Sequence, residues 1–155
     1  MPPFIQDWYI NNSKELKSGK PYILFSASKQ PERSTCPDAG YFYSHLDIIK
    51  TLVQVLPSDY FIYYKEHPSN VRKPWAMDAQ RTLSYYENLM KIAPERIKFL
   101  RFDTDPFLAI DNSTAVASAT GSTCWEAIIR GKPSLIFGSN WFENCPGVFK
   151  FKSIC

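Results

Sequence analysis

The chain has 155 residues, a length typical of one domain, and 45% of them are hydrophobic against 21% charged. This composition excludes a disordered or fibrous protein. Lysine and arginine total 18 against 15 acidic residues, and the resulting net charge of +3 is too small to indicate a nucleic-acid-binding surface or a basic membrane-surface helix. We therefore expect no nucleic-acid partner, and any anionic ligand must be held by local geometry.

The apolar segments of the chain are short. Runs such as Tyr22–Phe25 and Leu135–Phe137 have the length of strands, far below the roughly 20 residues of a membrane-spanning helix. The first ten residues lack the basic and apolar regions of a secretory signal. We therefore expect a cytoplasmic protein without a transmembrane segment. The four cysteines form no C-x-x-C pair and are interpreted as free thiols: Cys36, Cys124, Cys145 and Cys155.

Residues 1–20 are predicted to form a lead-in helix. Four apolar residues recur there at helical spacing: Ile5, Trp8, Tyr9 and Leu16. Gly19 followed by Pro21 ends the pattern. The rest of the chain, residues 21–155, is predicted to be one domain. Because the sequence ends shortly after a strand-and-loop pattern without a closing helix, we interpret it as a fragment of a longer protein.

Short apolar segments alternate with amphipathic segments along this domain. We predict five strands, at residues 22–27, 60–65, 97–100, 115–118 and 134–137. Helices are predicted between them, at 41–56, 76–92, 106–110 and 123–130, with Asp105 capping the third and Pro106 in its first position. Most of the strands are uninterrupted apolar runs, which is typical of a parallel sheet covered on both faces. The predicted fold class is therefore α/β, with a Rossmann-like parallel sheet.

Ligands of such sheets bind beyond the carboxyl ends of the strands. The segment Thr120–Thr123 leads from the fourth predicted strand into a helix, and a glycine with three hydroxyl residues at a helix N-terminus suits a phosphate. Spacing alone favours an alternative, a capping box in which Thr123 caps the helix and Glu126 reaches back. Because the capping box does not use Gly121 or Ser122, a helix cap and a phosphate site are compatible in this segment.

His67 follows the second predicted strand at the same edge of the sheet. In Lys65-Glu66-His67-Pro68 the imidazole can donate to a phosphate or ribose oxygen, and Pro68 stiffens the turn. A solvated loop histidine is the alternative. We predict that His67 and Ser122 lie close enough to share one small anion. His45 lies within a predicted helix and is interpreted as a surface or packing residue.

A polar loop follows the first predicted strand. It reads Gln30-Pro31-Glu32-Arg33-Ser34-Thr35, and Arg33 could pair with a carboxylate or a phosphate. An ordinary solvated surface loop is the alternative.

Five motifs occur in order from about Tyr22 onward: Gln30-Pro31-Glu32-Arg33, Lys65-Glu66-His67-Pro68, Thr120-Gly121-Ser122-Thr123-Cys124-Trp125-Glu126-Ala127, Arg130-Gly131-Lys132-Pro133, and Phe137-Gly138 through Trp141 to Cys145-Pro146-Gly147-Val148. This combination resembles the capsular polysaccharide biosynthesis family, which includes the Kdo transferases of bacterial capsule assembly. The His-Pro and Ser-Thr-x-x-Glu elements carry most of the resemblance.

The resemblance implies a GT-B architecture, two Rossmann-like domains facing across a cleft, with this chain similar to the C-terminal, nucleotide-binding one. It implies that His67 contacts the phosphate or ribose of the donor, that Ser122 and Thr123 contact the phosphate, and that Glu126 contacts the ribose hydroxyls. Pro68 and Gly121 belong to the same two phosphate-binding turns. Four further residues become candidate contacts of the donor or acceptor: Gln30, Glu32, Arg33 and Lys65.

The implied reaction is sugar transfer in capsular or surface polysaccharide biosynthesis. The donor would be a CMP-sugar such as CMP-Kdo, and the acceptor a polysaccharide or a glycolipid. In the family the acidic catalytic residue belongs to the N-terminal domain, so no catalytic residue is assigned in this chain. The missing N-terminal domain of the same protein is an expected partner, and peripheral association with the inner face of the membrane is compatible with the acceptor.

We expect neither a cofactor nor a metal ion. Asp103-Thr104-Asp105 has the spelling of a cation-binding Asp-x-Asp pair, but Asp105 is better explained as a helix cap. Two alternative functions are kept. One is the half of a sugar-nucleotide epimerase, which would bind UDP rather than CMP. The other is a non-catalytic polysaccharide-binding or export module without nucleotide affinity, in which Trp141 and Phe142 could form a sugar platform.

Overall fold

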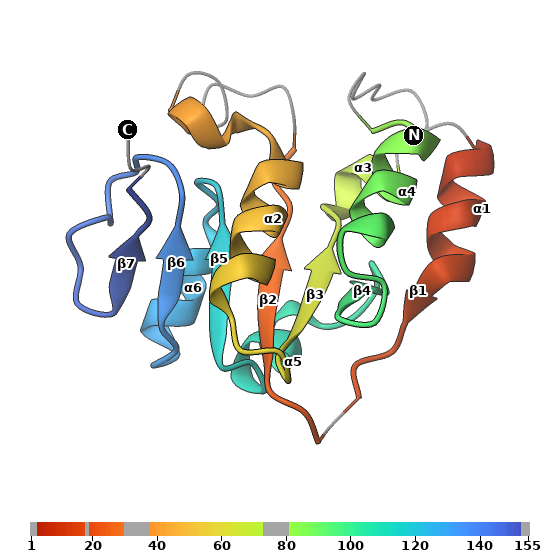
Figure 1. Cartoon of the computed structure of the whole chain (residues 1–155). Coiled ribbons are helices and arrows are strands. Elements are labelled where there is room, and N and C mark those ends of the chain that lie inside the picture. Colours follow the sequence, from red (N-terminus) through yellow and green to blue (C-terminus); the bar gives the residue numbers. More distant parts are fainter. Residues whose placement is uncertain (1–2, 18, 30–37, 73–80, 153–155) are drawn as a thin grey trace.

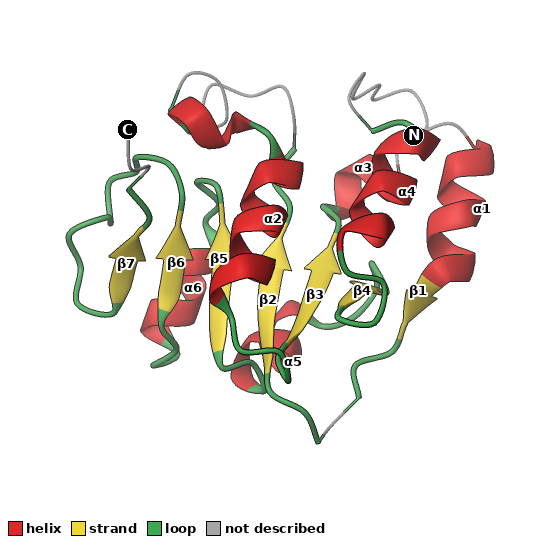
Figure 2. Ribbon diagram, in the orientation of Figure 1, coloured by secondary structure: helices red, strands yellow, loops and turns green. Residues whose placement is uncertain are grey.

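The computed structural model describes residues 3–17, 19–29, 38–72 and 81–152. The seven described strands form one parallel sheet, β1 (Ser13–Lys14), β2 (Tyr22–Ser26), β3 (Phe61–Lys65), β4 (Ile97–Leu100), β5 (Ala115–Ser118), β6 (Ser134–Ile136) and β7 (Val148–Lys150) (Figure 1). The helices are α1 (Pro3–Asn12), the 3-10 helix η1 (Gly40–Tyr43), α2 (His45–Val55), α3 (Pro68–Arg72), α4 (Leu83–Ile92), α5 (Pro106–Asp111) and α6 (Thr123–Ile129) (Figure 2). All strand pairs are parallel, which confirms the predicted α/β fold.

The strand order is β1-β4-β3-β2-β5-β6-β7. Leaving out β1, this is the order of a dinucleotide-binding Rossmann sheet. From β2 the chain builds outward through β3 and β4, and then crosses to the other side of β2 to form β5. The order reverses between β2 and β5, and ligands of this fold bind at such a switch point.

The N-terminal segment contributes to the sheet. The predicted helix is present, but it ends at Asn12 instead of continuing towards residue 20, and β1 then pairs with β4. The end is closed locally, because the Ser13 hydroxyl donates to the carbonyl of Ile10 at 2.8 Å. Leu16 lies beyond β1 and packs on the face of the sheet opposite to the face that α1 covers. The role of this segment as a lead-in from a preceding domain stays a prediction.

Alternating side chains of the central strands enter two different cores. On β2, Ile23 and Phe25 pack on one face of the sheet, whereas Tyr22 and Leu24 pack on the other. Helices α1, α2 and α4 cover the first face, and α5 and α6 cover the second (Figure 1). Because both faces of the sheet are covered, the central strands are mostly apolar, and this is the pattern that predicted a parallel sheet.

Two further predicted helix boundaries are wrong. The helix predicted at 41–56 is divided, because extended backbone at Ser44 separates η1 from α2. The helix predicted at 76–92 begins at Leu83, since Thr82 caps α4 by accepting a hydrogen bond from the backbone N–H of Tyr85 at 3.1 Å. Residues 76–80 lie outside the described residues.

Other predicted elements are confirmed. Asp105 caps α5, its Oδ1 accepting a hydrogen bond from the N–H of Phe107 at 2.8 Å, and Pro106 is the first helical residue. The five predicted strands all occur, with ends shifted by at most one residue. None of the helices in the described part of the chain is both long and apolar enough to cross a membrane.

The cysteine prediction is confirmed where the structure describes it. Cys124 and Cys145 carry free thiols, and burial raises the pKa of the Cys124 thiol to about 12. Cys36 and Cys155 lie outside the described residues.

Candidate functional site at the switch point of the sheet

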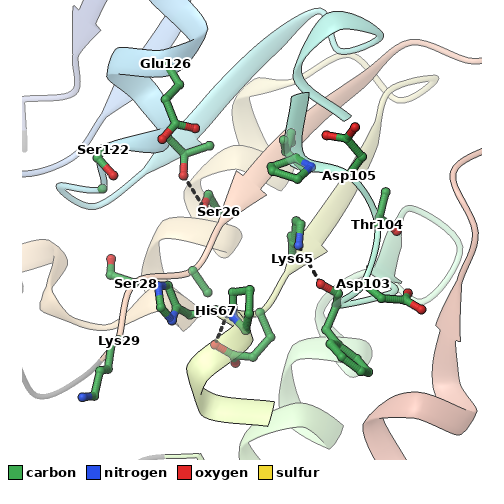
Figure 3. A pocket seen from close by; sticks show the side chains of 18 of the residues that line it. Ser26, Ser28, Lys29, Lys65, His67, Asp103, Thr104, Asp105, Ser122 and Glu126 are labelled. Atoms are coloured by element: carbon green, nitrogen blue, oxygen red, sulfur yellow. Dashed lines mark hydrogen bonds between the residues drawn. The ribbon is translucent and has the colours of Figure 1, made fainter. Parts of the chain in front are cut away.

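A cavity of about 500 Å³ opens at the carboxyl edge of the sheet, at the switch point (Figure 3). Its walls come from the loops that follow four neighbouring strands: Ser26–Lys29, Lys65–Pro68, Phe102–Pro106 and Thr120–Thr123, together with Glu126 of α6. This volume is within the usual range of small-molecule sites. A smaller cavity of about 300 Å³, beside Tyr22 at the start of β2, contains none of the predicted site residues.

The larger cavity brings together the predicted site residues that the structure describes, namely Lys65, His67, Pro68, Gly121, Ser122, Thr123 and Glu126. Gln30, Glu32 and Arg33 lie outside the described residues. His67 follows β3 and Ser122 follows β5, and these two strands are the neighbours of β2. Both residues therefore reach one cavity from the same edge of the sheet, whereas their sharing of one anion stays a prediction.

The hydrogen bonds of His67 fix the tautomer of its neutral form. Nδ1 accepts a hydrogen bond from the backbone N–H of Ser69 at 3.3 Å and lies 2.6 Å from the Ser69 hydroxyl oxygen. Because a backbone N–H can only donate, Nδ1 must be the acceptor, and the neutral ring carries its proton on Nε2. The imidazole lines the cavity and is exposed. His67 can therefore offer Nε2–H as a donor to a bound ligand.

The turn between β5 and α6 is held against the end of β2. The Gly121 N–H donates to the Ser118 hydroxyl at 3.0 Å, and that hydroxyl donates to the carbonyl of Ser26 at 2.9 Å. A Cβ atom at position 121 would lie 2.6 Å from the Ser118 Oγ, closer than real contacts allow. A larger residue would therefore displace the Ser118 hydroxyl from its two hydrogen bonds, and the turn places Ser122 and Thr123 on the cavity wall.

The predicted capping box is absent. Thr123 is the first residue of α6, and Ser122 takes the cap position with helical backbone angles (φ −62°, ψ −18°) and no side-chain capping bond. The Thr123 hydroxyl instead lies 2.9 Å from the hydroxyl of Ser26. In the described part of the chain, the Glu126 carboxylate has no hydrogen bond or ion pair. Glu126 thus lines the cavity with its acceptor oxygens available.

The part of the cavity wall formed by the end of β3 and the loop after β4 has both signs of charge. Lys65 is buried and its Nζ donates to the carbonyl of Phe102 at 3.0 Å. Asp103 pairs with Arg101, whose hydrogen bond and charge lower the pKa of the Asp103 carboxyl. Asp105 caps α5, so both aspartates of the Asp-x-Asp pattern have structural partners close by in the chain. Among the residues that the structure describes, no three His, Cys, Asp or Glu side chains form a group able to hold a metal ion.

Our sequence interpretation missed four residues of this region: Ser26, Ser28, Glu66 and Arg81. The two serines had a detectable signal, since polar side chains at the end of a buried strand are candidates for a site. The Ser28 hydroxyl oxygen is buried and has no partner within the described residues. Glu66 and Arg81 form a buried ion pair, with Nε 3.0 Å from Oε2. Nothing in the sequence links these two residues, which are 15 positions apart.

The aromatic residues of the loop between β6 and β7 lie elsewhere. The Trp141 side chain is 74% exposed and its ring centroid is 4.6 Å from that of Trp125, whereas Phe142 is buried. Neither Trp141 nor Phe142 is among the residues that line the cavity. The loop is nevertheless packed onto the site, because a Cβ at Gly138 would lie 2.5 Å from the Thr120 methyl carbon.

No protein-family profile matches the sequence, and no curated protein matches it. Among solved structures, the KpsC β-Kdo 2,7 transferase of Thermosulfurimonas dismutans is similar with a TM-score of 0.66 and 17% identity, over 98% of this chain and 48% of that chain. The KpsC β-Kdo 2,4 transferase of the same organism has a TM-score of 0.64 and 13% identity, over 98% and 50% of the two chains. UDP-GlcNAc 2-epimerase of Methanocaldococcus jannaschii, in complex with UDP-GlcNAc and UDP, has a TM-score of 0.57 and 11% identity, over 96% and 38%.

The chain spans about half the length of the two Kdo transferase structures and a smaller share of the epimerase. At these identities the likeness establishes the fold. The described chain therefore has the Rossmann-like fold of one half of a GT-B enzyme, with its cavity at the edge of the sheet where that fold binds ligands.

Proposed function

We propose that this chain is the donor-nucleotide-binding half of a glycosyltransferase that acts in capsular or surface polysaccharide biosynthesis, with a CMP-sugar such as CMP-Kdo as donor. The observation that carries the proposal is the cavity at the switch point, which is lined by His67, with Nε2–H as a donor, and by Ser122 and Thr123, from the loops after the two strands that flank β2. The GT-B half-domain fold supports it, because two structures with this fold are named as Kdo transferases.

The residues of the cavity have the chemistry that a nucleotide requires. His67 and the hydroxyls of Ser122 and Thr123 can donate to phosphate oxygens, each such bond contributing about 1.5–3 kcal/mol. The Glu126 carboxylate would repel a phosphate, but it can accept hydrogen bonds from ribose hydroxyls. The buried Lys65 adds a positive charge to the site. Pro68 and Gly121 shape the two turns that carry these groups.

The other half of the enzyme completes the proposal. The catalytic acid or base would come from the missing N-terminal domain, which would also bind the polysaccharide or glycolipid acceptor together with this chain. A glycolipid acceptor would place the enzyme at the inner face of the membrane by peripheral association. This chain's own contribution is to bind and orient the donor nucleotide.

The half of a UDP-sugar epimerase is the second candidate function. It is favoured by one observation, the similarity to a UDP-GlcNAc 2-epimerase that contains UDP. The two candidates differ in the base that the cavity accepts, because a cytosine presents an amino donor where a uracil presents a carbonyl acceptor. The preference for CMP or UDP therefore separates them.

A titration of the purified chain with CMP, UDP and GDP, followed by amide NMR shifts and calorimetry, tests the proposal. We expect preferential binding of CMP, and we expect His67→Ala to weaken it by about 10- to 100-fold, the loss of one charge-assisted hydrogen bond. Trp141→Ala is the control, because Trp141 is exposed outside the cavity and its loss should leave affinity unchanged. Preferential UDP binding would favour the epimerase half, and binding of none of the three by folded protein would contradict a nucleotide site and favour a non-catalytic module.

A further inference from the structure

Glu66 lies directly before His67, and its carboxylate is completely buried. Oε1 faces the start of α3, where it accepts hydrogen bonds from the backbone N–H of His67 at 2.9 Å and from Nδ2 of Asn70 at 3.0 Å. The Asn70 N–H in turn donates to the His67 carbonyl at 2.9 Å. These bonds fix the short turn in which the Ser69 N–H reaches the His67 ring. The orientation of His67 therefore depends on one oxygen of Glu66.

The second carboxylate oxygen of Glu66 faces the core. Oε2 accepts hydrogen bonds from Nε of Arg81 at 3.0 Å, from the hydroxyl of Tyr86 at 2.8 Å and from the hydroxyl of Tyr64 at 3.2 Å. Burial and the charge of Glu66 raise the pKa of Tyr86, so its hydroxyl stays protonated and donates. The buried carboxylate is thus bonded on both oxygens and anchored to the core on one side and to the His67 turn on the other.

Arg81 extends this network to the loop that follows β2. Its side chain is 1% exposed, and Nη2 donates to the carbonyl oxygen of Ser28 at 3.1 Å and to Nδ1 of His45 at 3.0 Å. Ser28 lines the cavity and carries the buried, unpartnered hydroxyl described above. One guanidinium therefore joins the loop after β2 to the loop after β3, and both loops form walls of the cavity.

Stability alone explains this arrangement poorly. The free-energy cost of taking two charges out of water offsets most of their mutual attraction. Buried ion pairs can therefore often be replaced by apolar side chains without loss of stability. Hydrogen bonds between buried charged groups instead specify one geometry. In this chain the specified geometry is the relative placement of two cavity loops, those of Ser28 and His67.

We propose that the Glu66–Arg81 pair positions the ligand-binding groups of the cavity, holding His67 with Nε2–H available to the ligand and holding Ser28 on the adjoining loop. Both are positioning residues, because they act through His67 and Ser28. The use of this geometry for a nucleotide rests on the proposed function. The geometry itself can be measured without any ligand.

The first experiment reads the His67 ring by ¹⁵N NMR of the imidazole in the whole chain at about pH 8, where an ordinary imidazole is neutral. We expect a single Nε2–H tautomer in the wild type. Glu66→Gln has one acceptor oxygen in place of two, so either the His67 turn or Arg81 loses its partner, and the ring should become a mixture of tautomers. Tyr86→Phe is the matched control, because it removes a donor from the core-side oxygen only and should leave the tautomer unchanged.

Two results would overturn the positioning role: averaged tautomers in the wild type, or unchanged imidazole shifts in folded Glu66→Gln. If Glu66→Gln does not fold, Arg81→Lys serves in its place. A lysine keeps the charge beside Glu66 but offers its donors from one nitrogen in place of the separate Nε and Nη2 of the guanidinium, so the Ser28 and His67 amide shifts should move together. Unchanged shifts at those two positions in folded Arg81→Lys would equally reject the proposal.

Calorimetry with CMP as the probe separates this inference from the proposed function. We expect folded Glu66→Gln to bind CMP about 5- to 30-fold more weakly than the wild type, a loss of about 1–2 kcal/mol, while Tyr86→Phe binds as the wild type does. If His67→Ala weakens binding but folded Glu66→Gln does not, the positioning role is wrong and the proposed function stands. If CMP binding is absent or independent of His67 while the tautomer responds to Glu66, the proposed function is wrong and the positioning of His67 stands.

Discussion

The hydroxyl oxygens of Thr123 and Ser26 lie 2.9 Å apart, and this contact joins the start of α6 to the end of β2. β2 and β5 are the strands between which the sheet order reverses, so the contact bridges the switch point itself. It engages the hydroxyl that would otherwise have capped the helix. Thr123, which suggested an ordinary capping box, therefore joins α6 to β2 in the wall of the cavity.

Our first prediction distinguishes this bridge from a helix cap. Thr123→Val keeps the shape of the side chain but removes the hydroxyl, and we expect it to lower the free energy of unfolding by about 1 kcal/mol. Ser122→Ala should change it by less than about 0.5 kcal/mol, because the Ser122 side chain makes no capping bond. Urea denaturation of both variants measures the difference. A loss of about 1–2 kcal/mol for Ser122→Ala and none for Thr123→Val would indicate a cap at residue 122 and no stabilising bridge.

The second prediction concerns the packing of Gly138. An added Cβ would lie 2.5 Å from the Thr120 methyl carbon, 2.8 Å from the Ala39 Cα and 2.9 Å from the Asp38 carbonyl oxygen. We expect Gly138→Ala to destabilise the fold by about 1–3 kcal/mol, as overpacking does. Because two of the three contacts are to backbone, adding Thr120→Ser should restore little of the loss. Full recovery of the urea midpoint in that double variant would show that the backbone can move aside.

The strands and the location of the site follow from local signals. Residues 97–100 and 115–118 are short apolar runs between polar segments, and both are strands with those bounds. Asp105 before Pro106 marks the start of α5 because the cap and the fixed proline backbone angle act within one turn. The parallel arrangement then brings the loops after the strands to one edge, which is why His67 and Ser122 could be assigned to one cavity.

The missed features depend on contacts that are distant in sequence. β1 has only two residues, Ser13 and Lys14, and it forms because β4 offers a free edge rather than because of its own composition. The hydroxyl partner of Thr123 is 97 residues away, so the local capping pattern was the stronger signal. The pairing of Glu66 with Arg81 likewise depends on how α4 packs beside β3, which no spacing rule specifies.

Our third prediction concerns the stability of the buried pair. Glu66→Leu would leave Arg81 charged and buried without its carboxylate, and we expect a loss of about 3–5 kcal/mol in the free energy of unfolding. The double variant Glu66→Leu with Arg81→Met should lose less free energy of unfolding than the two single variants lose together. We expect the difference, which is the coupling energy of the pair, to be about 0.5–3 kcal/mol. Tyr86→Phe, which removes one neutral donor, should cost about 1 kcal/mol. Additive losses in the double variant would show that the two side chains do not interact.

The last prediction concerns acid. Burial and the charge of Arg81 lower the pKa of His45 well below its usual value, and its Nδ1 accepts a hydrogen bond from Arg81 at 3.0 Å. His45 is therefore neutral in the folded chain when an unfolded histidine, with a pKa of about 6.5, already binds a proton. The unfolded state then binds more protons, so stability is fully present above about pH 6.5 and falls as the pH is lowered towards the folded pKa, by at most about 1.4 kcal/mol per unit.

His45→Gln offers Arg81 a carbonyl acceptor without a titrating group. It should reduce the slope of the free energy of unfolding against pH, measured by urea denaturation between about pH 7 and pH 5. An unchanged slope in His45→Gln would show that other groups cause the acid sensitivity.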